Sequence, residues 1–69
     1  MTISRATALS ARELEVLSLI AKGFTAREIG ERLDVVTKTA EAHTHNIYRK
    51  LGVNRRAEAA VEAVHLGLA

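Results

Sequence analysis

The sequence predicts an all-α fold, a single four-helix domain that contains a helix-turn-helix motif. Apolar residues recur at helical spacing, and four segments carry helix start and stop signals. Only residues 34–36 separate the second segment from the third; helices joined so tightly are typical of a helix-turn-helix, although many small bundles also have short turns. The 69 residues are 48% hydrophobic but include one Phe, one Tyr and no Trp, so the core must consist of Leu, Ile, Val and Ala.

The first helix is predicted to begin after Ser10 and to end at Gly23. Ser10 and Glu13 have the spacing of a capping box, in which each side chain bonds the backbone N–H of the other residue. Leu9 before the cap and Leu14 inside the helix have the spacing of a hydrophobic staple. Gly23 ends the helix because glycine adopts the left-handed conformation at low cost.

The second helix is predicted to begin after Thr25, with Glu28 as its capping-box partner, and to run to about Leu33. The two capping boxes explain the carboxylates of Glu13 and Glu28 better than a catalytic pair does. Gly30 lies inside this helix, where glycine costs about 1 kcal/mol relative to alanine. We therefore expect another helix to approach closely at Gly30.

The third helix is predicted over residues 37–51 and ends at Gly52. Its opposite surface is polar, and its inward stripe consists of Ala40, His43, Ile47 and Leu51. The fourth helix is rich in alanine, begins near Asn54 or Arg55 and ends at Gly67.

Composition bounds the domain organisation and the class of partner. Residues 1–8 are expected to be a flexible lead or the end of a linker, and residues 9–69 the domain. No Cys is present and no apolar run reaches the roughly 18 residues of a membrane span, so we expect a cytoplasmic protein without membrane contact. Residues 38–56 carry five basic side chains against one acidic. That pattern suits a polyanion such as DNA, although a solvated surface would also show it.

An ordered, ungapped set of residues spans all four predicted helices. The set comprises Leu9-Ser10, Arg12-Glu13, Glu15-Val16-Leu17, Leu19-Ile20-Ala21, Gly23, Thr25, Glu28-Ile29, Thr39, His43, Asn46-Ile47, Lys50-Leu51-Gly52-Val53, Arg56 and Glu58-Ala59. With these residues the chain resembles the LuxR family of helix-turn-helix domains, also called FixJ- or NarL-type, over about residues 9–68. The resemblance implies that the third helix enters the major groove of double-stranded DNA and that the fourth forms a homodimer. It also implies the output domain of a longer transcription regulator, with a receiver or small-molecule sensor upstream.

The chain departs from the family pattern at helix starts. The family usually has a capping Ser where Val36 stands, so either Thr37 replaces it as the cap or the cap is lost at about 1 kcal/mol. Ser or Thr is common where Arg55 stands, and we expect Asn54 to cap the fourth helix instead. Gly30 stands where Ala is usual.

The resemblance places Glu41, Ala42 and His45 at the positions that contact bases. Their chemistry fits, because Glu accepts from cytosine, Ala touches a thymine methyl, and His pairs with guanine or a phosphate. Cationic and hydroxyl groups on and around the third helix are the expected phosphate contacts. These candidates are Arg27, Lys38, Thr39, Arg49, Arg55 and Arg56.

The fourth helix has apolar residues on more than one face, which is more apolar surface than a bundle this small can cover. Ala60, Val61, Val64 and Leu68 are therefore expected to form a homodimer interface, with a purely internal core role as the alternative.

Other classes of function are weighed against DNA binding. His43 is expected to be a packed helix residue, and it lies about 200° around a helix from His45, so the two cannot share a metal. No cofactor, metal set or catalytic group is recognised, which makes an enzyme the least favoured class. Val36 and Glu41 motivate a protein-interaction module that has kept the fold and lost DNA. A sigma-factor-like promoter-recognition domain is a further alternative, against which residues 52–59 argue.

Overall fold

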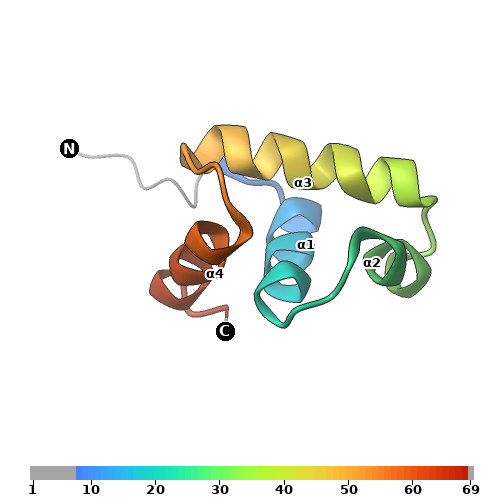
Figure 1. Ribbon diagram of the computed structural model, residues 1–69, viewed down its shortest axis with the longest axis horizontal. Coiled ribbons are helices and arrows are strands. Elements are labelled where there is room, and N and C mark those ends of the chain that lie inside the picture. Colours follow the sequence, from blue (N-terminus) through green and yellow to red (C-terminus); the bar gives the residue numbers. More distant parts are fainter. Residues whose placement is uncertain (1–7, 69) are drawn as a thin grey trace.

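A computed structural model of the chain describes residues 8–68. These residues form one domain of four helices. They are α1 (Ala11–Ala21), α2 (Ala26–Leu33), α3 (Thr37–Leu51) and α4 (Arg56–His65). The all-α prediction is confirmed, and residues 8–68 contain no strand. In Figure 1, α3 extends across one side of the domain, and α1 lies between α2 and α4. The predicted lead over residues 1–8 lies, apart from Ala8, outside the described residues.

The first two helices begin with the predicted capping boxes. At α1, the backbone N–H of Glu13 donates to Ser10 Oγ at 3.1 Å, and that of Ser10 donates to Glu13 Oε1 at 2.9 Å. At α2, the corresponding bonds between Thr25 and Glu28 measure 3.1 and 2.8 Å. Each box satisfies two backbone donors that a helix start otherwise leaves without a partner.

The last two helices begin without a side-chain cap. Val36 is the N-cap residue of α3 and Arg55 that of α4, and neither side chain bonds the helix start. The prediction that Asn54 caps α4 is therefore wrong, as is the alternative that Thr37 caps α3; the lost cap at Val36 is confirmed. At α4, the Glu58 carboxylate instead accepts the backbone N–H of Asn54 at 3.2 Å.

Gly30 is buried where α2 meets the turn that leads to α3. A Cβ atom at this position would lie 2.6 Å from the backbone oxygen of Val35, closer than real Cβ contacts come. The closest neighbour is therefore the turn and not, as expected, another helix, although the backbone nitrogen of Thr37, the first residue of α3, would also lie 3.4 Å away. Asp34 closes this turn in the left-handed conformation with φ 59°, and the Val35 N–H donates to the Gly30 carbonyl at 2.9 Å.

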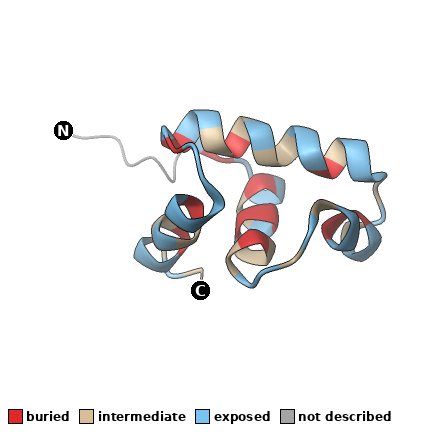
Figure 2. Cartoon of the chain, in the orientation of Figure 1, coloured by how far each residue is buried: buried red, intermediate tan, exposed pale blue. Residues whose placement is uncertain are grey.

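The core gathers around α1, which packs against each of the other three helices. Figure 2 shows the buried faces turned toward one another and exposed faces outward. The core residues are Leu9, Val16, Leu17, Ile20, Ile29, Ala40, Ile47, Leu51, Val53, Ala59 and Ala63. They are aliphatic, as the composition predicts, and they hold α3 by one side only. No helix of the described chain is long and apolar enough to cross a membrane.

Candidate nucleic-acid interface

The polar side of α3 is open to solvent. Glu41, Ala42 and His45 are all exposed, whereas Ala40 and Ile47 on the opposite side are fully buried. The outward side of α3 is largely exposed in Figure 2. Periodic burial of one stripe thus leaves the three predicted base-contacting residues accessible to a ligand outside the domain.

The candidate phosphate contacts differ in accessibility. Lys38 near the start of α3 and Arg49 near its end are exposed, as are Arg27 on α2 and Arg55 before α4. Thr39 is half-buried. Exposed cations therefore occur at both ends of α3, on α2 and just before α4. Arg49 also donates to the side-chain oxygen of Asn46 at 3.4 Å, one turn back.

Arg56 is used inside the domain. Its Nη2 atom donates to the carbonyl of Ile20 at 3.0 Å and also to the carbonyl of Phe24. These carbonyls belong to the end of α1 and the turn that follows, where backbone acceptors lack helical partners. Arg56 thus ties the start of α4 to the end of α1. Sequence reasoning missed this contact, because it joins residues 36 and 32 positions apart.

Lys50 is also used inside the domain, although it counts toward the positive charge of residues 38–56. Its Nζ lies 2.8 Å from Oε1 of Glu13, the buried box residue of α1. The hydrogen bond from Lys50, and then that from the Ser10 backbone, hold the pKa of Glu13 below its ordinary value of 4.5, whereas burial alone would raise it. The sequence indicated only the box role of Glu13.

The expected dimer residues divide into two groups. Val61 and Val64 on α4 are 53% and 58% exposed, and Ala60 is half-buried. Leu68 is half-buried and packs against the core, and its carbonyl accepts from Ser18 Oγ at 3.3 Å. The two valines are therefore the exposed apolar part of the predicted interface.

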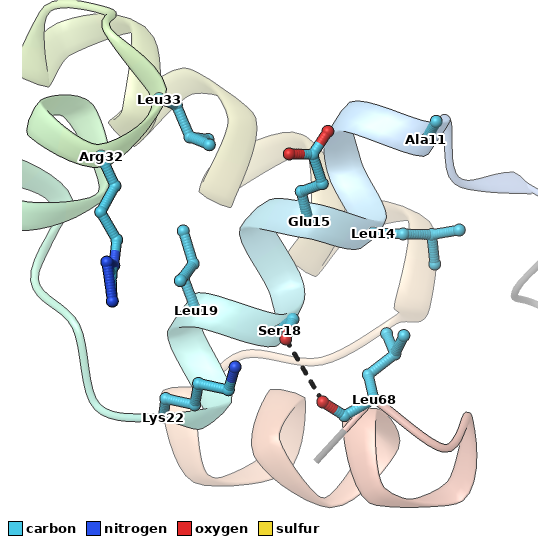
Figure 3. Close-up of a pocket in the computed structure, with 9 residues that line it drawn as sticks. All are labelled: Ala11, Leu14, Glu15, Ser18, Leu19, Lys22, Arg32, Leu33 and Leu68. Carbon is cyan, nitrogen blue, oxygen red and sulfur yellow. Dashed lines mark hydrogen bonds between the residues drawn. The ribbon is translucent and has the colours of Figure 1, made fainter.

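A groove of about 610 Å³ lies beside Leu68, lined by leucines and charged residues (Figure 3). Its apolar lining includes Leu14, Leu19, Leu33 and Leu68. It lies between α1, α2 and the C-terminal turn, and none of the predicted DNA-contacting residues lines it.

The histidines of the described chain do not form a metal site. His43 is half-buried, as expected of a packed helix residue, and His45 is exposed. Among residues 8–68, no group of three or more His, Cys, Asp or Glu side chains could hold a metal ion.

Comparison with known proteins gives consistent matches. The sequence model of the family described as "Bacterial regulatory proteins, luxR family" matches residues 7–63. The transcriptional regulatory protein LiaR of Bacillus subtilis is 53% identical over 55 residues, which are 80% of this chain and 26% of LiaR. The oxygen regulatory protein NreC of Staphylococcus aureus is 54% identical over 50 residues, which are 72% of this chain and 23% of NreC. The chain thus spans about a quarter of the length of these curated relatives.

Proposed function

The chain belongs to the luxR family of bacterial regulatory proteins, and from this premise we propose that it binds double-stranded DNA sequence-specifically as the output domain of a cytoplasmic transcription regulator. The observation that carries the proposal is the exposure of Glu41, Ala42 and His45 on the side of α3 that faces away from the core. A helix held by one side can enter the major groove with its other side.

We assign base contacts to Glu41, Ala42 and His45, with Glu41 accepting from a cytosine amino group and Ala42 touching a thymine methyl. His45 donates to guanine or to a phosphate. Glu41 repels phosphates wherever it stands, so its place on the exposed side favours reading of bases over non-specific adhesion to DNA.

Phosphate contacts are assigned to the exposed cations and to one hydroxyl, namely Arg27, Lys38, Thr39, Arg49 and Arg55. The sequence also pointed to Arg56, but the two carbonyl contacts of this residue favour a positioning role between α1 and α4. Lys50 is paired with Glu13 and is left out for the same reason. Fixed cations beside an exposed α3 orient the domain on the duplex without reading its sequence.

We further propose that α4 forms a homodimer through Val61 and Val64, with Ala60 beside them. A dimer would address two half-sites about one helical turn apart. The similar regions of LiaR and NreC are about a quarter of those proteins, which supports a longer regulator with an upstream receiver or sensor domain.

The test begins with selection of bound duplexes from a random pool. Binding to the selected duplex should weaken steeply as salt rises, and random DNA should bind far more weakly. Equal affinity for selected and random duplexes would refute sequence-specific binding.

Substitutions on α3 distinguish base contacts from phosphate contacts. Lys38→Ala should weaken binding to all duplexes about equally and reduce the salt slope by about 1, whereas Glu41→Ala or His45→Ala should change the preferred sequence. Lys22→Ala is the matched control, because Lys22 is an exposed lysine that lines the groove of Figure 3 instead of the exposed side of α3. Equal losses on every duplex for all three α3 variants would remove the base-contact assignment.

A specific observation favours one alternative function, a protein-interaction module. The apolar groove beside Leu68 would suit a protein partner, and a protein-interaction module of this fold would bind no duplex even at low salt. The same titration therefore decides between the two functions.

A further inference from the structure

Val36 is an exposed hydrophobic residue that neither the core nor the proposed dimer explains. Three large hydrophobic side chains are notably exposed in the described chain; two of them, Val61 and Val64, lie on α4. Val36 is the third, and at 69% it is the most exposed. It stands at the start of α3, the end from which side chains of a recognition helix reach base edges.

The backbone around Val36 is fixed, so its side chain has a defined place. The Val36 carbonyl accepts from the N–H groups of Thr39 at 3.0 Å and Ala40 at 3.2 Å. The preceding residue, Val35, is half-buried and packs against the core. A β-branched side chain also has few rotamers, so little entropy is lost when it contacts a ligand.

The charges near Val36 indicate which part of DNA it meets. Val36 shares a surface hollow of about 500 Å³ with Glu31, Asp34 and Arg27. Two carboxylates against one guanidinium disfavour a phosphate within the hollow itself, so the phosphate assigned to Arg27 lies outside it. Lys38, two residues farther along the chain, is exposed and suited to a phosphate. An apolar side chain between these charges is better matched to the apolar edge of a base.

We propose that Val36 is a specificity-determining residue that packs on the C5-methyl group of a thymine in the half-site. The inference rests on the proposed function and adds to it a contact beyond the three residues Glu41, Ala42 and His45. Thymine is the one DNA base that presents a methyl group in the major groove, so the contact discriminates against the other three bases.

The experiment replaces each thymine of the selected duplex, one at a time, with deoxyuridine, which lacks only the methyl group. Affinities are measured by fluorescence anisotropy for the wild-type chain, Val36→Ala and Val36→Ser. At one thymine of each half-site, we expect deoxyuridine to weaken wild-type binding about three- to tenfold. Val36→Ala should weaken binding to the thymine duplex similarly and should be indifferent to deoxyuridine at that position.

Two variants control for other causes of a lower affinity. Val36→Ser restores a capping side chain to α3, so a weaker affinity in this variant cannot come from a less stable helix. Ala42→Gly is the matched control, because it should remove sensitivity to a different methyl group.

The outcomes separate the inference from the function it rests on. The methyl contact is wrong if, at every thymine, the affinity lost by a Val36 variant and the affinity lost with deoxyuridine add independently. It is also wrong if the Val36 variants bind the selected duplex as tightly as wild type. In both cases the proposed DNA binding stands. If wild type shows no preference among duplexes, the proposed function fails and this inference fails with it.

Discussion

At the scale of single residues, Glu13 shows how one carboxylate can fix two parts of a small domain. It accepts the Ser10 N–H at the start of α1 and the Lys50 ammonium near the end of α3. The side chain is buried, and a buried charge is costly unless hydrogen bonds and an opposite charge compensate it. Here both are present, so the carboxylate stays ionised at neutral pH.

The pH dependence of stability follows from that environment. The pKa of Glu13 is lowered in the folded state, so its contribution is complete above the unfolded value near 4.5 and is lost as pH falls through the folded value. Glu13→Gln should lower the free energy of unfolding at pH 7 by about 1–3 kcal/mol and flatten the acid-side decline. Urea unfolding between pH 7 and pH 3 measures both effects.

Glu28→Gln is the control for that series. Hydrogen bonds from Thr25 and, to a smaller extent, the charge of Arg56 also lower the pKa of Glu28, but this box is exposed and Glu28 forms no direct ion pair like that of Glu13 with Lys50. The pH curve of Glu28→Gln should therefore stay closer to that of wild type. Parallel curves for wild type and Glu13→Gln would contradict the assignment.

The second prediction at this scale concerns the missing cap of α3. Val36→Ser offers a side-chain acceptor to the first turn and should raise stability by about 1 kcal/mol, or roughly 4–8 °C in Tm for a domain of this size. Val36→Ala removes the same exposed apolar group without adding a cap, and it should gain little. A thermal melt that shows no difference between the two variants would mean that water already satisfies the first turn equally well.

At the scale of elements, the sequence predicts structure well wherever the cause is local. The boxes at Ser10 and Thr25 depend on residues three apart, and the bounds of α3 follow from a periodic stripe that ends at Gly52. The same periodicity indicates that Glu41 and His45 face outward, because the opposite stripe is apolar.

The contacts that the sequence did not predict either join residues far apart in the chain or depend on the backbone conformation. Pairing of Lys50 with Glu13 joins residues 37 positions apart, and no periodic pattern encodes it. The neighbour of Gly30 is a carbonyl whose place depends on the left-handed Asp34, so side-chain patterns predict the wrong partner. The periodic pattern therefore located the exposed side of α3 but did not show that Lys50 and Arg56 also bind groups of this domain.

The tight turn between α2 and α3 gives the prediction for this scale. Gly30→Val would drive a branched side chain into the Val35 carbonyl, and we expect a loss of at least about 2 kcal/mol in the free energy of unfolding. Glu31→Val is the matched control, because Glu31 is the next residue of α2 and is exposed. Chemical denaturation of both variants tests the idea. Valine has a higher helix propensity than glycine, so a Gly30→Val variant as stable as wild type would show that the turn can move aside.

At the scale of the whole molecule, the two proposed interaction surfaces are separate. The domain is elongated, with extents of 38 × 19 × 18 Å, and no Cα atom of α2 lies within 8 Å of a Cα atom of α4. Figure 1 shows α2 and α4 on opposite sides of α1. The helix-turn-helix can therefore engage DNA at one place while α4 engages a second copy at another.

This separation predicts that dimerisation can be removed without removing DNA recognition. Replacing Val61 and Val64 together with Glu puts charges where α4 exposes its largest apolar groups, so association should weaken strongly. Binding to a duplex with a single half-site should stay within about threefold of wild type. Binding to two half-sites should lose the additional affinity that a linked pair of domains supplies. Sedimentation equilibrium and titrations on both duplexes measure these quantities.

His65→Glu is the control for this variant, since His65 is exposed on the same helix and the substitution also introduces an acidic group. It should leave association near the wild-type value. If the valine variant associated as tightly as wild type, α4 would not be the dimer surface. If a valine variant with the helical circular dichroism of wild type instead lost the single half-site as well, and the loss persisted at high salt, where repulsion between the added carboxylates and phosphates is screened, the two surfaces would be coupled.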